Sequence, residues 1–126
     1  METSNNPGMK FDGDKLRWGL IMRGMQASLR GVVAVATFGA RKYADDSWQN
    51  VDDAQKRYAD ALYRHLDNIA ERGHLTTDID MQPDGAGGLV DKGSGLLEWY
   101  HVAWNALALA WFASKQAREA AAKDTH

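Results

Sequence analysis

The sequence predicts an all-α fold, a single bundle of three to four helices. Three stretches carry apolar residues at steps of three or four, and no stretch of useful length alternates apolar and polar residues as a strand does. The chain has 126 residues, 44% of them apolar, which suits one domain with a modest core. We expect a polar tail over residues 1–13 and one helical domain over residues 14–126.

The first helical stretch is expected between residues 15 and about 43. Its apolar residues, from Leu16 to Ala36, recur at helical spacing. Three interior glycines weaken it, because each costs up to about 1 kcal/mol relative to alanine. The stretch is therefore predicted to be one broken helix, or two short helices that meet near Gly24.

A second helix is predicted from about Asp53 to Arg72, with Asp52 or Asp53 as its N-cap and Gly73 as its terminator. Its apolar residues fall at spacings of four, four and three, so they form one stripe along the helix. The stripe consists of Tyr58, Leu62, Leu66 and Ile69.

Residues 74–93 show no periodicity and are predicted to form a long loop, which in a compact domain is usually functional or disordered. Ser94 is then the expected N-cap of a third helix over residues 96–123. The third helix is apolar on nearly all sides, which predicts burial on more than one face and a homo-oligomer, a dimer or a tetramer. Its predicted core face is Leu97, Tyr100, Trp104, Leu107, Ala108 and Trp111.

Composition excludes several classes of function. The chain has no Cys, so disulfides, thiolate zinc sites and thiol nucleophiles are ruled out. A net charge of −2 argues against a nucleic-acid partner. No apolar run approaches the roughly 20 residues that span a bilayer, and the first ten residues lack the apolar stretch of a signal peptide. We expect a soluble, cytoplasmic protein with no membrane partner.

Glu98, His101 and Asn105 fall on one line of the third helix, at the edge of its apolar face. A carboxylate, an imidazole and a carboxamide are costly to bury there without partners, which favours a functional site. The alternative is a capping acid near the helix start, an interfacial histidine with satisfied hydrogen bonds, and a surface asparagine.

The second helix offers further polar candidates. His65 falls near the apolar stripe and is predicted to point inward or into a groove between helices. Asp67 and Glu71 are four residues apart and can hold a hard cation between them, although a solvated face with local Arg pairing explains them equally. Asp91 lies close enough to the third helix to join Glu98.

Basic and aromatic residues cluster in two short segments, a composition that suits phosphate charge and an aromatic base. Ordinary surface lysines beside buried tryptophans give the same pattern, and there is no Walker-type phosphate loop. The first segment contains Lys15 and Arg17, and the second contains Lys42 and Tyr43 and leads to Trp48.

Four segments in this order resemble the phage and bacterial dATP/dGTP diphosphohydrolase-like family, which is related to the all-α nucleotide pyrophosphohydrolases of the MazG and MazZ type. The resemblance covers most of the chain, and the order of the segments makes it fairly specific. The segments are Lys10–Trp18, Phe38–Tyr43 with Trp48 after it, Tyr63–Asp67 and Asp91–Leu109.

The resemblance implies a MazG-like oligomeric enzyme that uses Mg²⁺ or Mn²⁺ to cut a deoxynucleoside triphosphate, of a purine by the family name, into a monophosphate and pyrophosphate. Glu98 stands where His is more usual in the family, and Gln26–Ser28 stand where acids are often found. Positions that match the family's motifs are Lys15, Lys42, Tyr43, Trp48, Arg64, His65, Asp67, Asp91, His101 and Asn105.

The resulting hypothesis assigns three roles. His65, Glu98 and His101 are the catalytic candidates, with Asn105 beside them as a substrate-binding residue. The metal is expected on Glu98 with Asp67, Glu71 or Asp91, and the phosphates on Lys15, Arg17, Lys42 and Arg64. Tyr43 or Trp48 would stack on the base. The alternative is a non-catalytic helical oligomer that binds a nucleotide or a partner protein.

Overall fold

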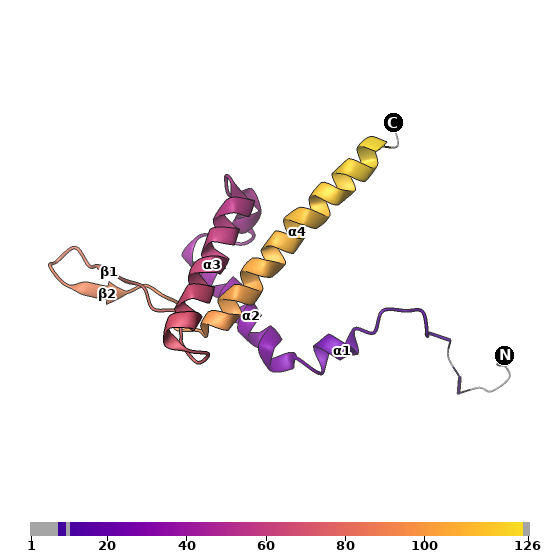
Figure 1. Cartoon of the computed structure of the whole chain (residues 1–126), viewed down its shortest axis with the longest axis horizontal. Helices are drawn as coiled ribbons and strands as arrows, with labels where there is room; N and C mark the ends of the chain where they lie inside the picture. Colours follow the sequence, from indigo (N-terminus) through magenta and orange to yellow (C-terminus); the bar gives the residue numbers. More distant parts are fainter. Residues whose placement is uncertain (1–7, 10, 125–126) are drawn as a thin grey trace.

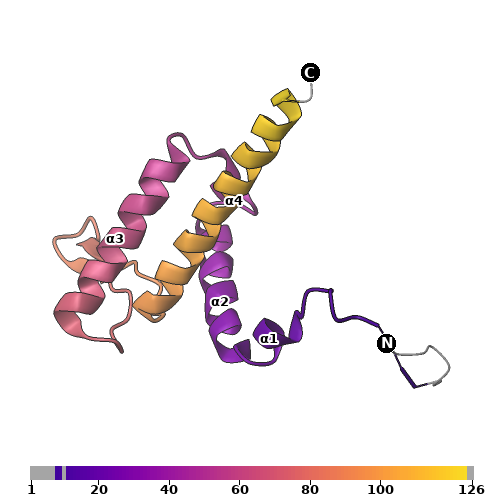
Figure 2. The ribbon, with the colours of Figure 1, turned by 45° about the vertical axis from the view of Figure 1, so that its right-hand side comes forward.

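A computed structural model describes residues 8–9 and 11–124 of the chain, and these residues form a helical bundle (Figure 1). Its central pair is α3 (Ala54–Arg72) and α4 (Glu98–Asp124), which run side by side in opposite directions (Figures 1 and 2). Helix α2 (Gln26–Lys42) packs against α4 as well. The predicted all-α bundle is therefore confirmed.

The first predicted stretch is two helices, the short α1 (Gly19–Met22) and the longer α2. The break falls at Gly24, where a Cβ atom would lie 2.6 Å from the carbonyl oxygen of Leu20. This confirms the prediction of two helices that meet near Gly24. Helix α1 begins four residues later than expected, because residues 15–18 are irregular and not helical.

Gly31 lets α2 approach α4 closely. It is buried, and a Cβ at this position would lie 2.5 Å from the ring of Tyr100. Gly31 is one of the three glycines that lower the helix propensity of this stretch. It is retained here because only glycine leaves room for the Tyr100 ring.

Helix α3 follows its prediction to within a residue. Asp53 stands at the predicted N-cap position in the left-handed conformation, with φ of 51°, but its side chain makes no capping hydrogen bond to the described residues. Gly73, with φ of 102°, ends it by donating its N–H to the Ile69 carbonyl at 2.7 Å. Its apolar stripe faces α4, and Ile69 is buried.

An aromatic cluster joins one end of α3 to α4. The 3₁₀ turn η1 (Ser47–Asn50) places the Trp48 ring 4.9 Å from that of Trp111, edge to face. The Tyr58 hydroxyl donates to the Trp48 carbonyl at 2.8 Å and so fixes the turn to α3. The members of the cluster are Trp48, Tyr58, Trp104, Trp111 and Phe112.

The segment expected as a loop without strands contains a β-hairpin, so this prediction is wrong. Strand β1 (Met81–Pro83) pairs antiparallel with β2 (Leu89–Asp91), with Gln82 opposite Val90. Asp84 stabilises the turn, because its Oδ1 accepts N–H bonds from residues 86 and 88 at 2.7 and 3.0 Å. Strands of three residues are too short to show alternation in a sequence.

Helix α4 begins at Glu98, so Ser94 is not its N-cap as predicted. The Ser94 hydroxyl instead accepts the N–H of Leu96 at 3.1 Å, in a turn that precedes the helix. Leu107, placed on the predicted core face, is 58% exposed. Among the described residues, no helix is both long and apolar enough to cross a membrane.

Candidate metal centre between α3 and α4

Glu98 lies at the centre of the polar end of the α3–α4 contact. As the first residue of α4 it is fixed by its own N–H, which donates to the Thr76 carbonyl at 2.9 Å. Its side chain is 0% exposed. Oε2 lies 2.7 Å from His65 Nδ1 and accepts a hydrogen bond from Asn68 Nδ2 at 3.1 Å, both from α3.

The other carboxylate oxygen of Glu98 is unusual. Oε1 is buried and has no hydrogen-bond partner among the residues that the structure describes. Buried polar atoms are nearly always paired, and an unpaired carboxylate oxygen carries a large desolvation cost. An additional positively charged or hydrogen-bonding group at Oε1 would remove that cost.

Asp78 reaches the same place from the loop after α3. Its N–H donates to the Leu96 carbonyl at 2.8 Å, and its carbonyl accepts the N–H of Gly95 at 2.9 Å. The backbone of Asp78 passes so close to Gly93 that a Cβ there would lie 2.6 Å from the Asp78 carbonyl oxygen. This double pairing fixes the Asp78 side chain, whose Oδ2 accepts the N–H of Ser94 at 2.9 Å.

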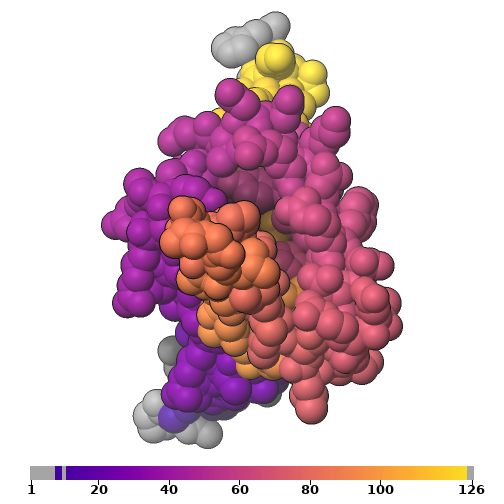
Figure 3. Space-filling view, turned by 90° about the vertical axis from the view of Figure 1, so that its left-hand side faces the viewer, coloured from indigo at the N-terminus to yellow at the C-terminus, as the bar shows by residue number. Residues whose placement is uncertain are grey.

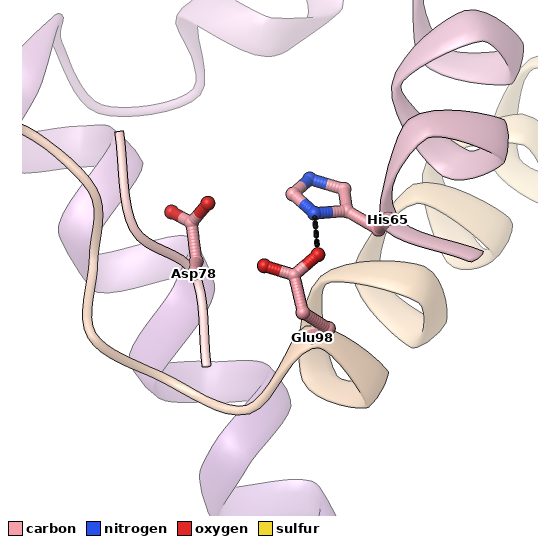
Figure 4. A group of neighbouring side chains, drawn as sticks. All are labelled: His65, Asp78 and Glu98. Carbon is pink, nitrogen blue, oxygen red and sulfur yellow. Dashed lines mark hydrogen bonds and ion pairs between the residues drawn. The ribbon is translucent and has the colours of Figure 1, made fainter. Parts of the chain in front are cut away.

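His65, Asp78 and Glu98 form a three-residue group in which one ligand atom from each lies within 4.8 Å of the others (Figure 4). An imidazole nitrogen and two carboxylates suit a divalent cation. Carboxylates favour Mg²⁺ and Mn²⁺, while imidazole favours the transition metals, so the set fits Mn²⁺ better than Mg²⁺. Because Oε1 of Glu98 has no partner among the described residues, these three side chains fit the divalent cation that the family resemblance implies.

His101 lies against this group. It is 7% exposed, its ring stacks on that of His65 at 4.6 Å, and its Nε2 lies 3.6 Å from Asp78 Oδ2. Nε2 is also hydrogen-bonded to the Ser94 hydroxyl at 2.5 Å. Burial, and next the nearby His65, lower the pKa of His101, and Asp78 and Glu98 oppose that shift. The imidazole is therefore neutral at physiological pH.

Four of the predicted site residues come together here. His65 contacts both Glu98 and His101 as described, and the buried Asn105 donates to the His101 carbonyl at 2.8 Å, one turn along α4. Each of the three α4 residues on the predicted line is buried, although neighbouring positions are exposed.

The other acids predicted to bind metal lie elsewhere. Asp67 and Glu71 are exposed on α3 and are not part of the three-residue group. Asp91 ends β2, and its Oδ1 accepts the N–H groups of Asp80 and Gly93, both at 2.9 Å. These two bonds lower the pKa of Asp91. Asp91 thus closes the open end of the hairpin.

The basic residues occupy two separate hollows. Lys15 and Arg17 line one of about 480 Å³ beside α1. Lys42 lines another of about 430 Å³, between the end of α2 and the residue that follows β2. This second hollow contains Phe38, Arg41, Lys42 and Lys92.

The remaining predicted substrate residues are Tyr43, Trp48 and Arg64. Tyr43 is 73% exposed, with the Lys42 ammonium 5.4 Å from its ring centre. The Trp48 ring is packed inside the aromatic cluster, and Arg64 is exposed on α3. On the face shown in Figure 3, the surface is hollowed between the hairpin and α3, with α4 at the bottom.

Sequence reasoning missed two residues of the site. Asn68 follows His65 by three positions, so helical spacing alone places both on one face of α3. Asp78 carries no such signal, because it stands in a segment without periodicity, among other acids. The backbone pairing of residues 76–78 with residues 95–98 brings it beside Glu98.

The fold and the site define a helical-bundle protein with a partly buried carboxylate–imidazole group suited to a divalent cation. A family model described as dATP/dGTP diphosphohydrolase, N-terminal, matches residues 5–122, and the chain belongs to this family. The family's name indicates hydrolysis of a deoxynucleotide. No curated protein and no solved structure matches the chain.

Proposed function

We propose that the chain hydrolyses a purine deoxynucleoside triphosphate, dGTP or dATP, to the monophosphate and pyrophosphate, with Mg²⁺ or Mn²⁺ as cofactor. The family match gives the class of reaction. The observation that carries the proposal is the unpaired, fully buried Oε1 of Glu98 inside a group that also contains His65 and Asp78. A protein without a ligand at this point has no evident reason to bury that atom.

His65, Asp78 and Glu98 would hold the metal. A bound divalent cation supplies two effects in such reactions: it polarises a phosphoryl oxygen, and it makes a bound water more acidic. Asn68 orients the Glu98 carboxylate by its hydrogen bond to Oε2, which leaves Oε1 directed away from α3's donors. Positioning of this kind commonly affects metal affinity about 10- to 100-fold.

His101 acts as a base in this proposal. Its lowered pKa keeps the imidazole neutral, and in the tautomer that is protonated at Nδ1 the Nε2 atom accepts the hydroxyl hydrogen of Ser94. The Ser94 oxygen in turn accepts the Leu96 N–H, which holds the hydroxyl in place. A proton taken from the attacking water can reach Nε2 directly or through this hydroxyl.

The triphosphate needs positive charge, because charge on the leaving pyrophosphate increases during the reaction. Lys42 offers it with its neighbours Arg41 and Lys92, in a hollow bordered by the hairpin. Arg64, Lys15 and Arg17 are the further cations of the proposal. The exposed Tyr43 ring is free to stack on the base, whereas Trp48 first has to leave the aromatic cluster.

The test incubates the purified protein with Mn²⁺ and each deoxynucleoside triphosphate, and measures monophosphate and pyrophosphate by chromatography. Asp78→Asn and Glu98→Gln are expected to lower turnover at least 100-fold, since each removes a charged ligand. Asp67→Asn and Glu71→Gln are the matched controls, because these exposed acids lie on α3 outside the group. We expect less than a threefold effect from either control.

Two outcomes contradict the proposal. If no triphosphate gives pyrophosphate with Mn²⁺ or Mg²⁺, the chain is not this enzyme, and binding of dGTP without turnover would favour a nucleotide-binding module. If the Asp67 and Glu71 variants lose activity while Asp78→Asn retains it, the metal lies on the exposed face of α3 and the three-residue group is structural.

A further inference from the structure

Two hollows on the surface contain basic side chains, but they differ in charge. The hollow beside α1 includes an acid, Asp12, among its basic residues. The other hollow lies between the end of α2 and the foot of the hairpin, and we call it the α2–hairpin hollow. Among the described residues it is lined by three basic side chains, one aromatic ring and no acid. These residues are Phe38, Arg41, Lys42 and Lys92. The α2–hairpin hollow is therefore the better site for an anion.

The three cations of the α2–hairpin hollow keep their charge available. None of them forms an ion pair with an acid in the described part of the chain. The Lys42 ammonium instead lies 5.9 Å from the centre of the Phe38 ring and 5.4 Å from that of Tyr43, and aromatic rings hold a cation without neutralising it. Asp91, the acid next to Lys92, has its Oδ1 hydrogen-bonded to two backbone N–H groups. Three positive charges thus remain for a ligand.

Lys92 reaches the hollow from a part of the chain 50 positions after Lys42. Its backbone is fixed at the foot of the hairpin, because its N–H donates to the Asp80 carbonyl at 2.7 Å. The residues on either side of it are held as well, since Asp91 Oδ1 accepts the Gly93 N–H at 2.9 Å. Two separate elements therefore bring cations to one place. Preorganised groups of this kind bind a ligand at a lower cost in entropy than flexible ones.

The size and chemistry of the hollow suit a chain of phosphate groups. Its volume of about 430 Å³ lies within the roughly 300–1,000 Å³ that is typical of small-molecule sites. An arginine fork binds phosphate oxygens in pairs, and lysine binds them as a point charge. A helix C-terminus carries partial negative charge, so at the end of α2 only side chains attract an anion. We propose that the α2–hairpin hollow binds a linear oligophosphate of two or three phosphate groups through Arg41, Lys42 and Lys92.

The position of the hollow deepens the proposed function, and this step rests on that function. Ser94 follows Lys92 by two positions, so their Cα atoms are at most about 7 Å apart. The Ser94 N–H donates to Asp78 Oδ2 at 2.9 Å, and Asp78 belongs to the three-residue metal group. The metal group and the α2–hairpin hollow therefore border the same short segment. A triphosphate with its α-phosphate at the metal group then places its two terminal phosphates in the hollow.

This arrangement gives the leaving group a second role. Hydrolysis between the α and β phosphates leaves the pyrophosphate in the α2–hairpin hollow, where it blocks the phosphate tail of the next substrate. Inorganic triphosphate, which has no base or sugar, would occupy the hollow in the same way. Both are therefore expected to inhibit the enzyme in competition with its substrate, and Lys92 is a substrate-binding residue that the hairpin supplies.

The first experiment measures binding of inorganic tripolyphosphate, pyrophosphate and phosphate to the metal-free full chain by titration calorimetry. We expect the affinity to fall in that order and to fall with salt, because the contacts pair opposite charges. Lys92→Met keeps most of the length of the side chain and removes its charge, and is expected to weaken tripolyphosphate binding about tenfold. Arg41→Gln is expected to do the same, and Lys92→Arg to stay within about threefold of the wild type.

Lys123→Met is the matched control, because Lys123 is exposed in the last turn of α4, at the end that points away from the hairpin (Figure 1). It should change the affinity less than about twofold. Lys15→Met with Arg17→Gln removes two cations from the hollow beside α1, and is expected to weaken binding less than Lys92→Met does. Circular dichroism confirms that each variant is folded.

A wild-type chain that binds tripolyphosphate no more tightly than about 1 mM at low salt overturns the proposal. So does a loss of affinity as large in Lys123→Met as in Lys92→Met, which indicates non-specific attraction. A larger loss in the double variant of Lys15 and Arg17 also overturns it, because the oligophosphate then lies beside α1. None of these results depends on turnover, so they stand whether or not the chain hydrolyses a triphosphate.

The link to the metal group is tested by inhibition, with turnover of dGTP as the readout. Tripolyphosphate should raise the KM for dGTP and leave kcat unchanged, and Lys92→Met should raise its inhibition constant about tenfold, in parallel with the calorimetry. If tripolyphosphate binds in the hollow without competing with dGTP, the hollow lies outside the path of the substrate and this step is wrong.

Discussion

The two ends of the α3–α4 contact differ sharply although the same two helices form them. At one end Trp48, Tyr58 and Trp104 pack edge to face with ring centres 5.5 to 5.9 Å apart. At the other end Glu98 is fully buried, and within the described part of the chain only one of its two carboxylate oxygens is paired. Aromatic pairs of this geometry stabilise a fold, whereas a buried, half-paired carboxylate destabilises it.

The difference indicates a division of tasks along the helix pair. The aromatic end contributes the free energy that keeps α3 and α4 together. This free energy offsets the cost of shielding charged groups from water at the polar end. Electrostatic interactions with a ligand are strongest where water is excluded. Natural proteins usually tolerate such groups only where function requires them.

The largest effect is expected at the aromatic end. Trp104→Ala should lower the free energy of unfolding by about 3 kcal/mol, since it removes a ring that contacts Trp48 and Tyr58. Denaturant unfolding followed by circular dichroism measures this. Trp99→Ala is the matched control, because the Trp99 side chain is 39% exposed and stacks on His74 outside the aromatic cluster, and it should cost less than about 1 kcal/mol. Equal losses would contradict the comparison.

The second prediction concerns the polar end, where a smaller change in the free energy of unfolding is expected. Glu98→Gln, measured without metal, should change the free energy of unfolding by no more than about 1 kcal/mol, because the lost bond to His65 is offset by the removal of a buried charge. Added Mn²⁺ should raise the melting temperature of the wild type and not that of the variant. A loss near 3 kcal/mol would show that Glu98 is a structural anchor.

The smallest effect concerns Asp91, which closes the hairpin that carries Asp78. Its pKa is lowered from 3.8 by the N–H groups of Asp80 and Gly93. A carboxylate with a lowered pKa stabilises the folded state above its ordinary value, and this contribution is lost as the pH falls through the lowered value. The amide chemical shifts of Asp80 and Gly93 should therefore move together below about pH 4.

The matched variant for this prediction is Asp91→Asn. It should show the shifted amide signals already at pH 7 and no further transition on acidification, because an amide cannot ionise. Turnover should stay within a few-fold of the wild type if Asp91 only closes the hairpin. A complete loss of Mn²⁺ binding in this variant would instead show that Asp91 is a metal ligand, as the sequence suggested.

Helix positions followed from the sequence because each depends on local signals. The stripe from Tyr58 to Ile69 and the terminator Gly73 placed α3, and Gly24 placed the break between α1 and α2. The hairpin was missed because two strands of three residues show no periodicity, and its register depends on the Asp84 turn and the Asp91 bonds.

For the site, the sequence by itself determined the line of Glu98, His101 and Asn105, because the helical repeat fixes which side chains share a face. Only the tertiary structure decided which acid stands opposite that line. Asp67, Glu71 and Asp91 were as eligible by residue type as Asp78, but pairing of the loop with the start of α4 selected Asp78. Such a choice depends on contacts between residues far apart in the chain, and no local pattern encodes them.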